Sequence, residues 1–101
     1  VSLEKLVEIN SYNTARIHGI PNKGVIAPSY DADIIIVDLK KTRKVTPEML
    51  HGVSDFSLYE GLELKGWPIM TICGGTTVME DGEIVGKPGT GMVVKNQPLQ
   101  M

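Results

Sequence analysis

The chain has 101 residues, of which 42% are hydrophobic and 22% are charged, and its formal net charge is −2. These values are typical of one small globular domain. The slightly acidic balance and the scattered Lys and Arg residues argue against nucleic acid as a partner. No apolar run reaches the roughly 18 residues that a membrane span needs. One cysteine, no disulfide and no signal-peptide pattern predict a cytoplasmic location.

The first residues predict two short helices separated by a kink. Ser2 is a suitable N-cap for the first helix, and Asn13 is a candidate N-cap for the second. Gly19 stands where a left-handed residue commonly ends a helix. The first helix carries an i, i+3, i+4 apolar face made of Leu3, Leu6 and Val7.

From Gly24 onward the pattern becomes that of β-structure. Residues 25–26 form a short apolar run, and residues 28–31 read as a turn. Residues 34–37 are consecutive β-branched side chains, which suit a strand covered on both faces. Residues 40–44 are rich in Lys and Arg and are expected to form a charged connection.

Two hairpins are expected further on. Residues 69–73 and 76–80 flank Gly74–Gly75, and residues 83–85 follow Asp81–Gly82. Between the charged connection and the first hairpin, the sequence predicts a single helical turn at Glu48–Leu50, with Thr46 as its N-cap and Pro47 at its first position. A long loop over residues 51–66 is expected to follow. The sum is two helices and about five short strands, an α+β chain whose isoleucine-rich strand lacks cover, so we expect a part of a larger structure.

The two histidines, His18 and His51, lie far apart and include no His-x-His pair, so they do not predict a zinc site. Asp31, Asp33 and Asp38 could in principle hold a metal or act as acid and base. Aspartates that bracket a strand more often cap turns and end strand pairing, and we favour that structural role.

The remaining candidate site residues also show no clear catalytic or binding pattern. Cys73 has no neighbouring base or cation and is expected to be a small core residue. Gly86–Gly91 resembles a phosphate loop but lacks its Gly-Lys-Ser/Thr ending and a following helix. Tyr59, Glu60 and Trp67 could anchor a binding surface or form an internal clamp. We therefore assign no catalytic, cofactor-binding or metal-binding residue to this chain.

Several stretches are familiar together and in order. They are Leu6–Glu8 with Asn13–Gly19, Lys23–Ile26 with Asp31–Asp38, Ser54–Gly61, and Lys65–Pro68 continuing through Thr71, Ile72 and Gly75 to Glu80–Glu83. In combination they resemble the end of the cyclic amidohydrolases, the group of hydantoinases, dihydropyrimidinases and dihydroorotases. The resemblance covers nearly the whole chain.

The resemblance implies a parent enzyme with a (β/α)₈ barrel and a β-sandwich composed of strands from both ends of the protein. Residues 1–20 would be terminal helices that pack on the barrel, residues 21–86 the C-terminal share of the sandwich, and residues 87–101 a Gly/Pro-rich tail. This chain would close the sandwich, brace the barrel and support a homo-oligomer. Its partner would be the barrel part of the same enzyme.

The resemblance also implies that the parent opens a cyclic amide with a hydroxide held between two zinc ions. The family's ligands belong to the barrel strands, and His18 and His51 match none of them. Ser29 stands where relatives usually have glycine, so it must accept any positive φ there at a cost. Thr14 and Gly74–Gly75 also differ from the residues that are common in relatives.

The motifs leave the subfamily open. Ser54–Gly61 and Gly66–Pro68 favour hydantoinases and dihydropyrimidinases, whereas Pro21–Gly24 and Tyr30–Asp33 are similar to some dihydroorotases, and allantoinase is a third candidate. Two other functions stay open. Metal-free relatives of dihydropyrimidinase act as assembly proteins, and the loop at 51–66 could make the chain an independent binding module.

Overall fold

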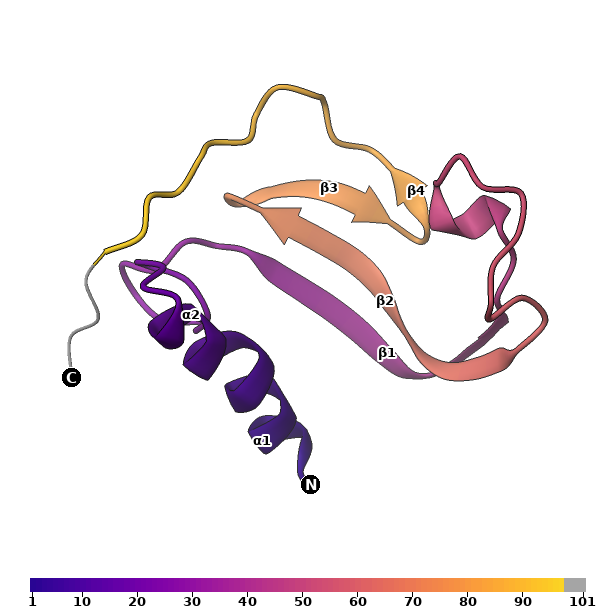
Figure 1. The fold of residues 1–101 in the computed structure, drawn as a ribbon, viewed down its shortest axis with the longest axis horizontal. Coiled ribbons are helices and arrows are strands. Elements are labelled where there is room, and N and C mark those ends of the chain that lie inside the picture. Colours follow the sequence, from indigo (N-terminus) through magenta and orange to yellow (C-terminus); the bar gives the residue numbers. More distant parts are fainter. Residues whose placement is uncertain (98–101) are drawn as a thin grey trace. The chain divides into compact units, whose positions relative to one another are not determined.

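The structure is a computed structural model that describes residues 1–97 of the chain. A helical segment comes first, a four-stranded sheet of order β1-β2-β3-β4 follows, and residues 85–97 form no helix or strand (Figure 1). The α+β prediction is confirmed. The elements are α1 (Leu3–Val7), η1 (Glu8–Tyr12), α2 (Asn13–Ile17), β1 (Ile34–Lys44), η2 (Glu48–Leu50), β2 (Glu63–Cys73), β3 (Thr76–Glu80) and β4 (Glu83–Ile84).

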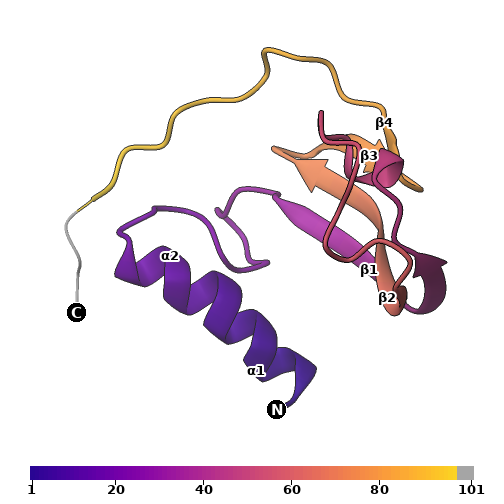
Figure 2. The same ribbon diagram turned by 45° about the vertical axis from the view of Figure 1, so that its right-hand side comes forward.

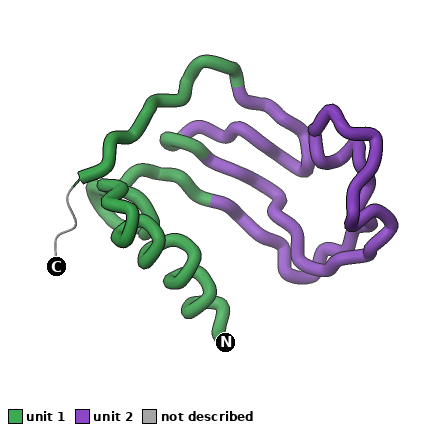
Figure 3. Tube along the Cα trace, viewed as in Figure 1, with its two compact units in different colours: residues 1–34, 73–75, 87–101 green, residues 35–72, 76–86 purple. Residues whose placement is uncertain are grey.

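The chain divides into two compact units (Figure 3). The first contains residues 1–34, the β2–β3 turn at residues 73–75 and the tail from Lys87. The second contains residues 35–72 and 76–86. The tip of the first hairpin therefore belongs with the helical segment, although most of the two strands that it joins lies in the other unit.

The helical segment runs without a break from Leu3 to Ile17, as Figure 2 shows. Ser2 is the N-cap, and its hydroxyl oxygen accepts the Lys5 N–H at 3.1 Å, as predicted. The expected N-cap at Asn13 is wrong. Asn13 is helical, with φ −66° and ψ −39°, because η1 is a π-helical turn in which its N–H donates to the Glu8 carbonyl. The two α-helices are thus joined rather than separated.

The turns after the helix follow glycine and proline positions. Gly19 has φ +66° and ends the helix as predicted. Residues 25–26 do not form the expected strand, because the chain is bent there and turns again at once. The Tyr30 N–H donates to the Ala27 carbonyl at 3.2 Å, with Ser29 at φ +72°. The sequence therefore forms a turn that normally places glycine at this position.

Strand β1 is longer than the β-branched run alone predicts. Residues 40–44 continue the strand instead of forming a connection, since pairing with the adjacent β2 overrides their weak strand propensity. Asp38 consequently lies inside β1 and does not end it. Beyond the strand, Val45 donates its N–H to Leu62 at 2.8 Å and accepts the Gly61 N–H at 2.9 Å.

Both predicted hairpin turns are present. Gly74 and Gly75 have φ +57° and +82°, and Asp81 and Gly82 have φ +50° and +82°. Positive φ at both central residues matches the twist of the flanking strands. Strand β3 then pairs antiparallel with β4, with Met79 opposite Ile84. The described residues contain four strands, one fewer than expected, because residues 25–26 form none.

The described chain has very little core. Its buried hydrophobic residues are Ala15, 7% exposed, and Val45, 4% exposed. In β1, Ile35 is 62% exposed and Ile36 is 43% exposed. Because successive strand residues point to opposite faces, this strand is uncovered on both sides within the chain. No helix within residues 1–97 has the length and apolar character to cross a membrane.

Candidate functional site

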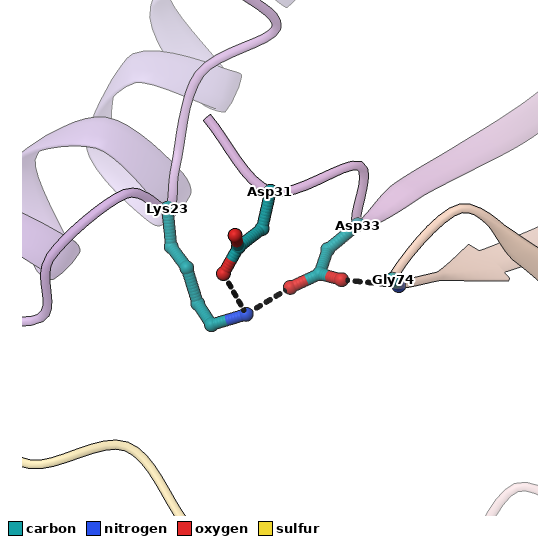
Figure 4. Close-up of polar contacts among 4 residues, drawn as sticks. All are labelled: Lys23, Asp31, Asp33 and Gly74. Atoms are coloured by element: carbon teal, nitrogen blue, oxygen red, sulfur yellow. Dashed lines mark hydrogen bonds and ion pairs between the residues drawn. The ribbon is translucent and has the colours of Figure 1, made fainter. Parts of the chain in front are cut away.

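Three charged side chains, Lys23, Asp31 and Asp33, form a cluster of polar contacts (Figure 4). The Lys23 ammonium forms an ion pair with one oxygen of Asp33 and another with Asp31 at 3.0 Å. The second oxygen of Asp33 accepts the Gly74 N–H at 2.8 Å. The two aspartates thus hold a lysine, and Asp33 also holds a backbone amide of the β2–β3 turn.

Local backbone bonds position this cluster. The Asp31 N–H donates to the Asn22 carbonyl at 2.8 Å, which brings the residue before Lys23 beside the aspartate segment. The Asp33 N–H donates to the Asp31 carbonyl at 2.9 Å, so the chain folds tightly between the two carboxylates. The Gly75 N–H donates to Ala32 at 3.0 Å.

The cluster shifts two titrations. The hydrogen bond from Lys23 and then that from the Gly74 amide lower the pKa of Asp33 below its ordinary value of 3.8. The hydrogen bonds to Asp33 and Asp31 raise the pKa of Lys23 above 10.5. Both shifts stabilise the charged forms at neutral pH. The Asp31 and Asp33 carboxylates are therefore engaged by a cation, the opposite of a vacant metal site or a general base.

The other candidate residues, His18, His51 and Asp38, form hydrogen bonds to residues outside this cluster. His18 is exposed at the C-terminus of α2, and its carbonyl accepts the Asn96 side-chain N–H at 2.7 Å. His51 is left-handed, with φ +56°, and its Nε2 lies 3.1 Å from the Gly82 carbonyl. An oxygen of Asp38 accepts the Lys40 N–H at 2.9 Å. The side chains of His51 and Asp38 thus contact backbone groups, and the His18 contact is made by its backbone carbonyl.

The expected core position of Cys73 is wrong for this chain. Its thiol is free and exposed, because the residue is the last of β2 and borders the Gly74–Gly75 turn, where little chain covers it. The Gly86–Gly91 stretch lies in coil, and no helix follows it within the described residues. A phosphate loop needs such a helix.

The aromatic candidates contact their own surroundings. The Trp67 indole N–H donates to the Leu64 carbonyl at 2.6 Å, and the Arg43 guanidinium lies 5.5 Å from the centre of its ring. Tyr59 is 62% exposed, and the Glu60 N–H closes a local turn by donating to Ser57 at 3.2 Å. This turn fits the hypothesis that the loop forms an internal clamp. The exposed Tyr59 side chain fits the other hypothesis, that the loop is a binding surface.

The described residues do not fit a zinc centre. Nowhere in residues 1–97 do three or more His, Cys, Asp or Glu side chains come together in a group that could hold a metal ion. The Asp31 and Asp33 carboxylates both pair with the Lys23 ammonium. We derive no catalytic step from these residues.

Comparison with known proteins identifies the family of the chain. Residues 1–78 match the family described as the amidohydrolase family. The chain belongs to the amidohydrolase family. A D-phenylhydantoinase of Escherichia coli is 35% identical over 100 residues, which are 98% of this chain and 22% of that protein.

Solved structures of amidohydrolases agree closely with the fold. The L-hydantoinase (dihydropyrimidinase) of Arthrobacter aurescens gives a TM-score of 0.88 at 35% identity, over 95% of this chain and 22% of its own. The dihydropyrimidinase of Brevibacillus agri gives 0.91 at 32% identity, over 100% of this chain and 22% of its own. The resemblance to hydantoinases and dihydropyrimidinases is confirmed, and the chain spans about a fifth of the length of these relatives.

Sequence reasoning missed the role of Lys23. The lysine stands eight and ten positions before the two aspartates, with no helical or strand spacing to connect them. Its partnership depends on the turns at Asn22 and Ser29, both of which have positive φ. The only signal in the sequence was the joint presence of Lys23 and the Asp31–Asp33 segment in the motif that resembles the cyclic amidohydrolases.

Proposed function

We propose that this chain is the non-catalytic C-terminal portion of an enzyme that hydrolyses the ring C–N bond of cyclic amides, with a hydantoin or a dihydropyrimidine as substrate. The match to hydantoinases and dihydropyrimidinases over 95–100% of the chain carries this proposal. Those proteins are named for such substrates. The reaction adds water across the bond and leaves an open-chain acid.

The chemistry of the proposed parent enzyme requires groups outside this chain. Two zinc ions held by the barrel would activate the attacking water and polarise the carbonyl. The contribution of this chain is structural. Residues 1–20 would pack on the barrel, and residues 21–86 would complete the sandwich. The expected tail, residues 87–101, lies partly outside the described residues.

The exposed apolar side chains of the chain support a bracing role. Leu3, Leu6 and Val7 on the helix are 55%, 49% and 58% exposed. A monomeric protein seldom leaves a continuous apolar stripe uncovered. We propose that the barrel of the same enzyme covers this face, and that the complete enzyme is a homo-oligomer. The cytoplasmic location stays a prediction.

The first test measures ring opening by the complete protein. We expect turnover of 5-phenylhydantoin or dihydrouracil, loss of turnover after zinc chelation, and recovery when zinc is added back. The double variant His18→Ala, His51→Ala of the complete protein should keep kcat and KM unchanged. A loss of about 100-fold or more in kcat would show that this chain supplies an acid or base.

The alternatives give different results. A complete protein that binds no zinc and opens neither ring fits a metal-free assembly protein. Cooperative unfolding of the 101-residue chain alone would instead support an independent binding module. Within residues 1–97 only Ala15 and Val45 are buried, and so small a core argues against such a module.

A further inference from the structure

Three separate segments meet at Asp33 (Figure 4). We call this meeting point the junction, and it consists of residues 22–24, 31–33 and 74–75. Asp33 is the residue that reaches both other segments, since one carboxylate oxygen pairs with Lys23 and the other accepts the Gly74 N–H. Asp31 contacts Lys23 through its side chain but has no side-chain bond to the turn among the described contacts.

The two glycines of the β2–β3 turn have open space where a side chain would lie. A Cβ atom added at Gly74 or at Gly75 would meet nothing within 4 Å, so neither glycine is packed against a neighbour. Both residues are glycines at positive φ, and glycine has the greatest backbone freedom of any residue. The bonds to Asp33 and to the Ala32 carbonyl are the contacts that join this turn to the loop.

The loop side of the junction is fixed to the helical segment. Gly24 has φ +95°, and a Cβ atom there would lie 2.7 Å from the Ser11 carbonyl oxygen in the π-helical turn. Such close packing leaves residues 22–24 little freedom to move. The Asn22 carbonyl also accepts the Asp31 N–H. A chain of contacts thus leads from the helical segment through the loop to Asp33.

We propose that Asp33 fastens the β2–β3 turn to the loop that packs on the helix, and that neutralising this carboxylate frees the turn while the sheet stays folded. The charged groups that face Asp33 are Lys23 from the loop and Asp31 from its own segment, and Cys73 is the titratable residue that borders the turn. Lys23 balances one of the two carboxylates. A hydrogen bond from an amide to a charged acceptor is about twice as strong as a neutral one.

Residue-resolved hydrogen exchange of the complete protein tests this fastening. We expect Asp33→Ala to accelerate exchange at Gly74 and Gly75 by about tenfold or more, in line with the usual strength of hydrogen bonds to charged groups. Asp31→Asn is the matched control. It removes a neighbouring carboxylate and one ion pair but leaves both Asp33 contacts, so exchange at the turn should change less than about threefold.

A second variant keeps the test decisive if Asp33→Ala does not fold. Asp33→Asn retains an oxygen that can accept the Gly74 N–H but loses the charge, so it should accelerate exchange less than Asp33→Ala and clearly more than Asp31→Asn. Unchanged exchange at the turn in the folded Asp33 variants would overturn the proposal. Equal acceleration at the β3–β4 amides would also overturn it, since that result means general loosening of the sheet.

Discussion

Replacing Gly24 by alanine tests how closely the loop approaches the helix. The residue has φ +95°, a region that costs a non-glycine residue about 1–3 kcal/mol. The new Cβ would lie 2.7 Å from the Ser11 oxygen and 3.1 Å from the Tyr12 Cα. Both neighbours are backbone atoms, so neither can rotate away, and overpacking of this kind costs about 1–3 kcal/mol. We expect a total loss of about 2–6 kcal/mol in the free energy of unfolding.

Gly61 is a matched control for this substitution. Its φ is +86°, close to that of Gly24, but an added Cβ would meet nothing within 4 Å. Gly61→Ala should therefore cost the backbone strain alone, about 1–3 kcal/mol. Both variants restrict the unfolded chain equally, so that contribution cancels in the comparison.

Urea unfolding of the complete protein measures the difference. The two variants are compared through their unfolding midpoints, and an equal m-value would show that the same transition is observed in each. We expect Gly24→Ala to be less stable than Gly61→Ala by about 1–3 kcal/mol. Equal losses in the two variants would refute the close approach, because strain alone would then explain both.

Three further outcomes follow from single residues. Ser29→Gly should raise the urea midpoint by the equivalent of up to about 1 kcal/mol, because it relieves a non-glycine residue at φ +72°; a lower midpoint would contradict the strain. Val45→Ala should cost about 2 kcal/mol in the same assay, since Val45 is 4% exposed and loses two buried carbon groups; a change near zero would mean that the site is not a core. The junction should be protected from hydrogen exchange between two pH limits. The lowered pKa of Asp33 adds stability that is present above pH 3.8 and is lost as the pH falls through the lowered pKa. The raised pKa of Lys23 adds stability that is present below pH 10.5 and is lost as the pH rises through the raised pKa. If protection of the Gly74 amide, corrected for intrinsic exchange, does not fall at acid pH, the role of the carboxylate is contradicted.

The turns were the most predictable part of the fold. Gly19, Gly74–Gly75 and Asp81–Gly82 all adopt the positive φ that their residue types favour. Ser2 caps the helix as expected because its bond reaches only three residues along the chain. Ser29 accepts the positive φ that the family's glycine implied. These features depend on neighbouring residues, which a sequence displays directly.

The errors have more than one cause, and only the first of them is contact between distant residues. Residues 40–44 look like a charged connection, but strand pairing with β2 extends β1 through them. Asn13 looks like an N-cap, but the π-helical turn carries the helix past it. Cys73 looks like a core residue, but its strand ends at an exposed turn.

For the site, the sequence alone determined the residue types and the family motif, and only the tertiary structure decided their partners. The motif already contained Lys23 and the Asp31–Asp33 segment, but nothing in their spacing joins the lysine to both aspartates or Asp33 to the amide of Gly74. Gly74 lies 41 positions from Asp33. Short-range propensity acts over a few residues, whereas a contact at this separation exists only once turns and strand pairing have brought the segments together.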